Sequence, residues 1–322
     1  MVIRAFLLLT SLLAASLSHS AEKSADALKV FICGSASPLL DLRRAKACIA
    51  VVTESEFFLF DTGAGSGGRL TAGRLPSQRL SGVFFTHYHS DHISDLYNIN
   101  LTSWVAGRPY PLAVYGPTGI RRVVAGMNEA YALDRGYRVA HHGEALLNPE
   151  YGLLRAIPIK EGKIYERGAF AITAIAVDHR PIVPAFGYRI DYAGRSVVIS
   201  GDAVVSDALM KASEGVDLLL HDALAPEVLR GAIEQAEDAG LAKRAQILRD
   251  VTNYHAHTRD IAAAATKANV KQLAFYHLVP PPRNEAMAAV FMAGVPEEVI
   301  LTEDLMWFEL PLGSEALIVS GP

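Results

Sequence analysis

The sequence predicts a layered α/β fold built from two similar halves. Short apolar runs followed by helical patterns occur in two successive rounds, as expected when buried strands are covered by amphipathic helices. The chain has 322 residues, of which 51% are hydrophobic and 20% are charged, and this composition excludes disordered, collagen-like and coiled-coil proteins. No fixed-period repeat, low-complexity run or Pro/Gly-rich linker divides the chain.

The charge balance and the histidine count narrow the class of protein further. The chain carries 30 Lys and Arg against 34 Asp and Glu, and the resulting net charge of −4 argues against a strongly cationic nucleic-acid binder. It also has 11 histidines beside only 2 cysteines. The positions of the histidines are therefore the most informative feature of the composition.

The first twenty residues have the pattern of a secretory signal. A short cationic start ending at Arg4 precedes an apolar run over 5–17, and the small residues Ser18 and Ser20 suit a signal peptidase. The run is too short for a lasting bilayer anchor, although an N-terminal anchor is the alternative interpretation. We therefore expect an exported protein, periplasmic or secreted, with its signal over 1–20.

Export bears on the meaning of the two cysteines, because disulfides form outside the cytosol. Cys33 ends one predicted strand and Cys48 lies at the start of the next. If these strands pair, a disulfide between them is feasible and would add about 3 kcal/mol by loop closure. Two separate buried thiols are an equally good interpretation. Neither cysteine has a spacing suited to zinc.

The elements of each round follow from apolar runs bounded by turn residues. In the first round we expect strands at 29–33, 47–53, 57–60 and 82–86, then helices within 95–106 and 118–133. In the second round we expect strands at 157–159, 171–177, 187–192, 196–200 and 218–221, helices at 226–249 and 258–268, and a last strand at 273–276.

The decisive segment follows the fourth predicted strand, which ends at Thr86. In an extended chain, His87 and His89 point to the same side. Asp91 and His92 come on the turn just beyond, where a helix can start. Four metal-binding side chains thus converge at one strand end. Imidazole and carboxylate suit zinc, manganese or iron, and an imidazole-rich site favours zinc.

This H-x-H-x-D-H segment resembles the signature of the metallo-β-lactamase superfamily. The resemblance extends over nearly all of the chain after the signal, to a D-x-G segment at Asp61, to His179 and Asp202 after later strands, and to His277. It implies a four-layer αβ/βα metallo-β-lactamase sandwich for a single hydrolase domain over 21–322. It also implies a centre of two Zn²⁺ ions at one sheet edge, with manganese or iron as the alternative.

The same resemblance implies a ligand for each metal position. One metal would take His87, His89 and His179, the other would take Asp91, His92 and His277, and Asp202 would lie between both. Asp61 would orient a ligand rather than bind metal itself. Each of these residues follows a strongly apolar run, the pattern of buried strands that deliver side chains at their ends.

Three further segments resemble the ribonuclease Z branch of this superfamily: 187–190, 219–223 and the His-Thr pair at 257–258. In that branch, a histidine paired with an acidic residue protonates or stabilises the leaving group. The resemblance makes His257 and Asp222 the predicted catalytic pair.

The identity of this histidine is left open at the level of sequence. His255 and His221 are the alternatives to His257. Asp91 is the third residue expected to take part in catalysis.

We expect a small-molecule ester as the substrate, and nucleic acid is a less favoured partner. An exported enzyme does not meet precursor tRNA, the net charge is negative, and the sequence shows no long Gly/Pro-rich basic insert. Segments 103–104, 114–119 and 276–281 look more like exported arylsulfatase-type relatives. The expected reaction is therefore cleavage of an aryl sulfate or a phosphodiester by a metal-bridging hydroxide.

Three other functions remain as alternatives. They are a ribonuclease Z-type endoribonuclease or phosphodiesterase on nucleic acid, a lactonase or β-lactamase, and a non-catalytic metal-binding protein. Asp202 counts against a lactamase, because some lactamases have cysteine there and others lack a bridging aspartate. We expect no stable membrane span, and a homodimer is left open.

Overall fold

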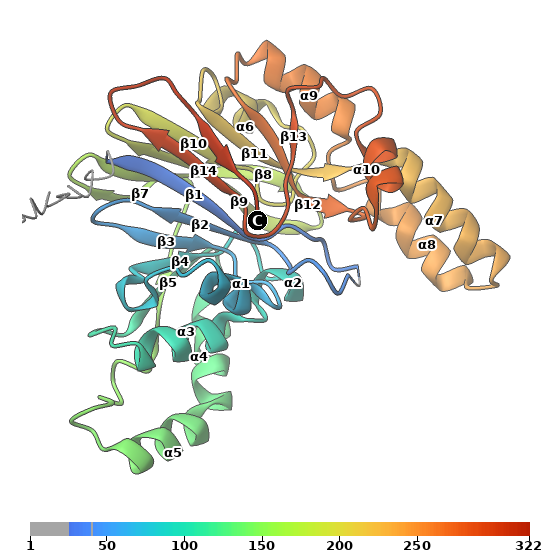
Figure 1. The fold of residues 1–322 in the computed structure, drawn as a ribbon. Coiled ribbons are helices and arrows are strands. Elements are labelled where there is room, and N and C mark those ends of the chain that lie inside the picture. Colours follow the sequence, from blue (N-terminus) through green and yellow to red (C-terminus); the bar gives the residue numbers. More distant parts are fainter. Residues whose placement is uncertain (1–25, 40) are drawn as a thin grey trace, which may run out of the picture.

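The computed structural model of the chain describes residues 26–39 and 41–322 (Figure 1). The predicted signal at 1–20 lies outside the described residues. Two mixed β-sheets face each other and helices cover their outer faces, so the predicted metallo-β-lactamase-type α/β sandwich is confirmed. No helix in the described part of the chain is both long and apolar enough to cross a membrane.

The first sheet has eight strands within the described residues, in the order β15-β14-β1-β2-β3-β4-β5-β6. Neighbours from β3 to β6 run parallel, and the other pairs are antiparallel. The strands are β1 (Ala27–Gly34), β2 (Cys48–Val52), β3 (Phe57–Phe60), β4 (Gly82–Phe84), β5 (Leu112–Gly116), β6 (Leu154–Pro158), β14 (Trp307–Pro311) and β15 (Ile318–Ser320).

The second sheet has seven strands over the same described ranges, in the order β13-β12-β11-β10-β9-β8-β7. Strands β10 to β13 are parallel neighbours, whereas β7, β8, β9 and β10 pair antiparallel. The strands are β7 (Gly162–Arg167), β8 (Phe170–His179), β9 (Ile182–Tyr192), β10 (Arg195–Ile199), β11 (Leu218–Leu224), β12 (Leu273–Val279) and β13 (Ile300–Leu301).

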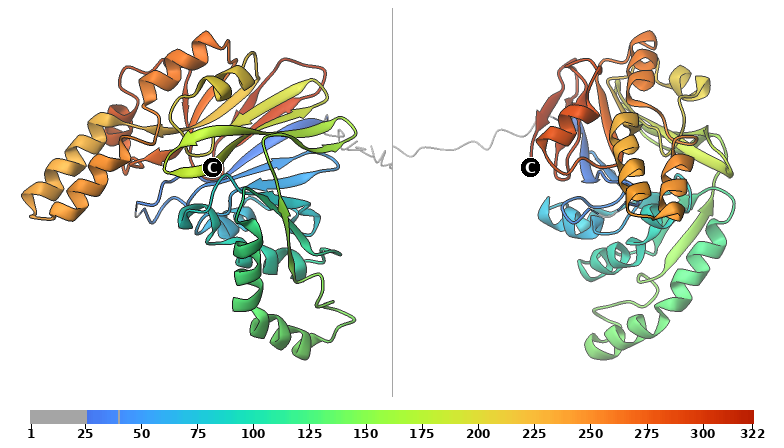
Figure 2. Two further views of the ribbon diagram at one scale, coloured as in Figure 1. Left: turned by 180° about the vertical axis from the view of Figure 1, so that it is seen from behind. Right: turned by 90° about the vertical axis from the view of Figure 1, so that its right-hand side faces the viewer.

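Helices cover the outer faces and also project from the body. The first half of the chain contributes α1 (Ser66–Ala72), η1 (Ser77–Arg79), α2 (Ser90–Ile93), α3 (Leu96–Val105), α4 (Ile120–Ala130) and α5 (Ala132–His142). The second half contributes α6 (Asp207–Ala212), α7 (Pro226–Asp238), α8 (Ala242–Val251), α9 (Thr258–Lys267) and α10 (Glu285–Phe291). Helices α5 and the α7–α8 pair extend away from the sheets in different directions (Figures 1 and 2).

Side-chain alternation along the strands explains the layers. In β3, Phe58 and Phe60 join the core between the two sheets, where Phe84 and Tyr188 also lie. Leu59, one residue out of phase, belongs instead to the core under the helices of the first half. All of these side chains are buried, and complete burial of one such side chain is worth about 1.5–3 kcal/mol. The apolar run of β3 is therefore that of a strand covered on both faces.

The strand directions place the candidate site at one edge of the sandwich. Strands β3 and β4 are parallel in one sheet, and β10, β11 and β12 are parallel in the other. Their carboxyl ends meet at the same edge of each sheet, which is where ligand-binding residues gather in α/β folds. The predicted metal ligands lie after β4 and β10, at the end of β8 and near the end of β12.

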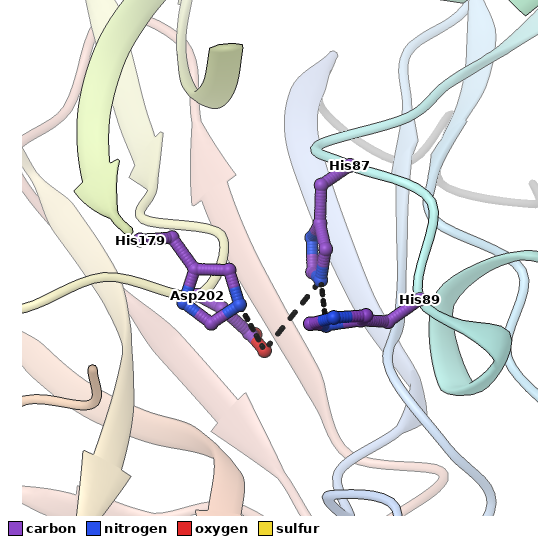
Figure 3. A group of neighbouring side chains, drawn as sticks. All are labelled: His87, His89, His179 and Asp202. Atoms are coloured by element: carbon purple, nitrogen blue, oxygen red, sulfur yellow. Dashed lines mark hydrogen bonds and ion pairs between the residues drawn. The ribbon is translucent and has the colours of Figure 1, made fainter. Parts of the chain in front are cut away.

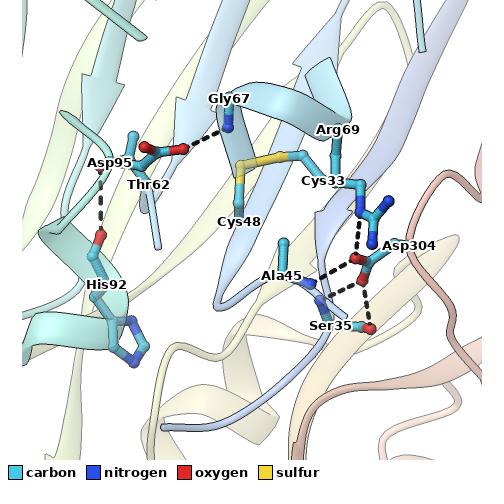
Figure 4. Close-up of a disulfide and its surroundings, with 10 residues drawn as sticks. All are labelled: Cys33, Ser35, Ala45, Cys48, Thr62, Gly67, Arg69, His92, Asp95 and Asp304. Atoms are coloured by element: carbon cyan, nitrogen blue, oxygen red, sulfur yellow. Dashed lines mark hydrogen bonds and ion pairs between the residues drawn. A yellow bond between two sulfur atoms is a disulfide. The ribbon is translucent and has the colours of Figure 1, made fainter. Parts of the chain in front are cut away.

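The structure shows whether the two cysteines are bonded, and it corrects two of the predicted helices. Cys33 and Cys48 form a disulfide with a Cα–Cα distance of 5.0 Å between β1 and β2 (Figure 4). The predicted helix over 226–249 is two helices, α7 and α8, because the chain reverses at Gly240 with φ 68°. The helical prediction for 118–133 also missed that a separate helix, α5, follows α4.

Candidate metal centre

The first sheet supplies its site residues from one turn. Strand β4 ends at Phe84, His87 follows three residues later, and His89 has extended backbone as the residue before helix α2. His87 and His92 are completely buried and Asp91 is 6% exposed, whereas His89 is exposed. The turn therefore holds three side chains inside the protein and leaves one at its surface.

The second sheet supplies three residues from three different strands. His179 ends β8, Asp202 follows β10, and His277 lies within β12. At His277 the register between β11 and β12 shifts, and its φ of 44° lies in the left-handed region. Such an irregularity re-aims a side chain next to a site, which accounts for how a residue inside a strand turns toward the edge.

One close approach of backbone brings the two halves together. Gly201 has φ 64°, and a Cβ on it would lie 2.6 Å from the carbonyl oxygen of Phe186 and 3.0 Å from the Cβ of Thr86. A side chain at this position would therefore separate the turn after β10 from the turn after β4. Only glycine allows Asp202 to lie against the histidines of the first sheet.

Asp202 lies at the centre of the assembled site (Figure 3). Its Oδ2 is 3.9 Å from the Nε2 of both His87 and His179 and 3.3 Å from the Nε2 of His92. Its Oδ1 is 3.3 Å from His277 Nδ1. One carboxylate thus contacts four imidazoles, as the predicted position between two metals requires.

The candidate ligand atoms of the described residues form three groups, and the third joins Asp202 and His277 to His255. His87, His89, His179 and Asp202 each offer a ligand atom within 4.8 Å of the others, and Asp91, His92 and His277 form the second group. Within the second group, His277 Nε2 is 3.1 Å and His92 Nε2 is 3.5 Å from Asp91 Oδ2. The structure therefore brings all seven predicted ligands together in the predicted two groups.

The chemistry of these atoms fits divalent metal ions. Nε2 of His92, Nε2 of His179, Oδ1 of Asp202 and Nδ1 of His277 are buried without a hydrogen-bond partner. Buried polar atoms are rarely left unpaired, and these four all face the same small volume. Imidazole nitrogens with carboxylate oxygens are the donor set of zinc, and they also suit manganese and iron.

Contacts behind the ligands orient their rings. Asp61 Oδ2 accepts a hydrogen bond from His92 Nδ1 at 2.8 Å, and its two oxygens also accept from the backbone and the hydroxyl of Thr86 at 2.9 Å. His179 Nδ1 donates to the carbonyl oxygen of Tyr254 at 3.1 Å. These bonds turn the Nε2 atoms inward, so Asp61 occupies the orienting position that the sequence predicted.

Burial and neighbouring carboxylates shift the pKa values of the buried histidines in opposite directions. Burial, together with the neighbouring His92, holds the pKa of His87 well below its usual value. For His92, burial alone would lower the pKa, but the carboxylates of Asp202 and Asp61 outweigh it and raise the pKa well above 6.5. The negative charges of Asp202 and Asp61 are thus what favours the protonated form of His92.

The predicted pairing of Asp222 with His257 is wrong. The Nδ1 of His255 donates to Asp222 Oδ2 at 2.8 Å, and both residues are buried. The side chain of His257 is 40% exposed, and its nearest carboxylate is Asp260 at 3.9 Å. His257 precedes helix α9 and points outward, whereas His255, two residues earlier, faces the metal groups.

The third alternative, His221, also contacts Asp222. Its Nδ1 is 3.1 Å from Asp222 Oδ1, on the side of the carboxylate away from His255. Burial would raise the pKa of Asp222, but the hydrogen bonds from His221 and His255 outweigh it and lower that pKa. For His255, burial lowers the pKa, and the bond to Asp222 more than compensates and raises it. The hydrogen bond to Asp222 therefore favours the protonated form of His255.

The fold and the site define a class of metal-dependent hydrolases, and comparison with known proteins agrees. A model of the Beta-lactamase superfamily domain matches residues 57–278. The ribonuclease Z of Mycobacterium bovis is 34% identical over 256 residues, which cover 79% of this chain and 86% of that protein. The ribonuclease Z of Mycobacterium sp. strain KMS is 31% identical over 291 residues, 89% of this chain and 97% of that protein.

This chain belongs to the β-lactamase superfamily and, within it, to the ribonuclease Z family. It is a metal-dependent hydrolase that acts on ester bonds. Solved structures share its fold at lower identity. Human tRNase Z, short form, has a TM-score of 0.61 at 22% identity and covers 88% of this chain and 100% of its own. YhfI from Bacillus subtilis, a metallo-beta-lactamase fold protein, has a TM-score of 0.64 at 18% identity and covers 88% and 99%.

The arylsulfatase-like segments have structural roles in this fold. Ser103 and Trp104 lie in α3, and the indole of Trp104 donates to the carbonyl oxygen of Asn148 at 3.0 Å. The segment 114–119 completes β5, and the carbonyl oxygen of Pro117 accepts from the Tyr88 hydroxyl at 2.6 Å. None of these contacts selects a substrate, and the relatives found do not support an arylsulfatase.

Proposed function

We propose that this enzyme is a dinuclear phosphodiesterase of ribonuclease Z type whose substrates are nucleic-acid phosphodiesters. The observation that carries the proposal is the pair of ligand groups whose histidines both contact the Asp202 carboxylate, with the His255–Asp222 pair beside them. The identity to ribonuclease Z over most of the chain supports the same substrate class. A nucleic-acid substrate therefore replaces the small-molecule ester expected from the sequence.

The negative net charge does not oppose this choice. Whole-chain charge reports an average, whereas phosphate binding depends on the charge at the site. When bound, two divalent ions supply that local positive charge and lower the pKa of a water molecule toward about 7. We infer that His87, His89 and His179 would hold one ion and that Asp91, His92 and His277 would hold the other, with Asp202 between the two groups.

In the proposal, a residue of the first half accepts the proton of the attacking water, and a residue of the second half protonates the leaving oxygen. Asp91 is 6% exposed, and its Oδ2 contacts His277 and His92. We infer that its Oδ1 accepts the proton of the attacking water. His255 is buried, bonds to Asp222 through Nδ1 and lies beside Asp202 and His277. In the proposal its Nε2 protonates the leaving oxygen, the role that the sequence assigned to His257.

We also propose that the enzyme works after export. The signal-like pattern at 1–20 suggests secretion, and the Cys33–Cys48 disulfide suits an oxidising compartment. Its substrates would then be nucleic acids outside the cytoplasm. Sequencing of the mature amino terminus tests this part: a start at residue 21 supports it, and a retained Met1 on protein from the native cell contradicts it.

A substrate panel tests the function. Protein loaded with zinc or manganese is assayed on bis(p-nitrophenyl) phosphate, an RNA oligonucleotide, an aryl sulfate, a lactone and a β-lactam. We expect cleavage of the two phosphodiesters, its loss after dialysis against a chelator, and its return on adding metal. Weakening of RNA cleavage by salt supports nucleic acid as the substrate. Preference for the aryl sulfate, the lactone or the β-lactam contradicts the proposal, and metal binding without turnover indicates a binding protein.

A further inference from the structure

Tyr254 lies against two imidazoles of the site. Its ring centroid is 5.5 Å from that of His179 in an edge-on arrangement and 4.9 Å from that of His255. Its carbonyl oxygen accepts the Nδ1–H of His179 at 3.1 Å. The residue is thus placed by both its backbone and its ring, between the candidate metal ligand His179 and the proposed proton donor His255.

The segment that carries Tyr254 is fixed in position. It connects α8 to α9, and the backbone N–H of Leu224 in β11 donates to the carbonyl oxygen of Ala256 at 2.8 Å. Strand β11 also carries Asp222, so one strand anchors both the His255–Asp222 pair and the segment with Tyr254. A short rigid connection of this kind can hold two side chains at fixed positions over the site.

The phenol hydroxyl of Tyr254 has no partner among the described residues, although the ring is half-buried. By contrast, the hydroxyls of Tyr88 and Tyr188 donate to the carbonyl oxygens of Pro117 and Phe85. The hydroxyl of a ring that lies against His179 and His255 is therefore available as a donor.

We propose that the Tyr254 hydroxyl donates a hydrogen bond to a non-bridging oxygen of the substrate phosphoryl group. The inference rests on the proposed phosphodiesterase function and adds a catalytic residue to it. His255 acts on the leaving oxygen, while Tyr254 stabilises the negative charge that remains on the phosphoryl oxygens. A donor aimed at developing charge in a site with little water is worth about 10²-fold in kcat.

The test uses Tyr254→Phe, which removes one oxygen and keeps the ring. With bis(p-nitrophenyl) phosphate we expect kcat to fall at least about 10-fold with little change in KM and with the full metal content. The matched control is Tyr192→Phe, whose hydroxyl donates to Asp26 at 2.9 Å at the far end of β9, and this variant keeps wild-type kcat. Unchanged kcat in Tyr254→Phe overturns the inference.

Two further measurements separate this role from a merely structural one. Across aryl phosphodiesters of increasing leaving-group pKa, Tyr254→Phe keeps the wild-type slope, whereas a steeper slope places the hydroxyl on the leaving oxygen and contradicts the inference. Inorganic phosphate binding to the zinc-loaded protein, measured by calorimetry, weakens in Tyr254→Phe, and equal affinity also overturns it. Failure of the wild type to cleave any phosphodiester rejects the proposed function instead, and phosphate binding still tests Tyr254.

Discussion

The two halves of the molecule build the same site in opposite ways. The first half presents four of the seven candidate ligands within one turn, from His87 to His92. The second half presents His179, Asp202 and His277 on three strands whose ends meet only in the folded sheet. A contiguous turn holds its ligands through local backbone, whereas dispersed ligands depend on strand pairing and register.

The halves also differ in what supports their ligands. In the first half, Asp61 braces His92 and Thr86, and the Cys33–Cys48 disulfide joins β1 to β2 nearby. In the second half, a register shift turns His277 out of β12, and the His255–Asp222 pair lies beside it. The first half thus supplies a rigid metal-binding turn, and the second half adds the shared carboxylate and the proton donor.

The largest expected effect breaks the link between the halves. Asp202→Ala removes the carboxylate that contacts four histidines, so we expect loss of tight binding of two metals. We also expect kcat to fall by more than about 100-fold, because even residues that contact a metal only through its ligands are worth about 10–100-fold. Metal content by atomic emission and phosphodiesterase assays measure both. The control is Asp238→Ala, an exposed position at the end of α7. Two equivalents of tightly bound metal in Asp202→Ala would contradict the shared role.

A second change tests the proton donor in the second half alone. His255→Ala is expected to lower kcat by about 10²–10⁴-fold while metal content stays the same, because the ring supplies a proton rather than a ligand. His257→Ala is the matched control, since its side chain is exposed and away from Asp222, and it should be silent.

Asp222→Asn gives the corresponding pH test. The Asp222 carboxylate raises the pKa of His255, so its loss lowers that pKa. Activity that requires charged His255 is lost as pH rises through this pKa, and the alkaline limb of the kcat profile therefore moves to lower pH. An unchanged profile, or a loss of activity in His257→Ala equal to that in His255→Ala, speaks against the pair.

The smallest effect on catalysis is expected in the first half. Replacement of Cys33 and Cys48 by serine opens a loop with a sequence separation of 15 and lowers stability by about 3 kcal/mol. The ligand turn after β4 is held by Asp61 and not by the disulfide, so kcat and metal content should remain near wild type. Thermal unfolding followed by circular dichroism measures the loss, with the reduced wild type as a parallel sample. An equal unfolding midpoint would show that the disulfide adds no stability.

Prediction from sequence was most accurate for features formed by residues that are close together in the chain. The strand over 57–60 matches β3, and the turn at 87–92 brings its ligands together as expected. It was weakest between α7 and α9, where one periodic pattern spans two helices and a rigid segment. His255 and His257 are only two residues apart, and the sequence alone does not indicate which one faces inward.

The sequence by itself determined the two-round α/β architecture and the metal-binding residue types, because apolar periodicity and a compact motif are local properties. Only the tertiary structure decided that the cysteines are bonded, that His255 and not His257 pairs with Asp222, and that Tyr254 lies over the site. The disulfide depends on the pairing of β1 with β2, and the other two depend on β11 meeting the segment between α8 and α9. The side-chain directions there are set by register, which no local pattern records.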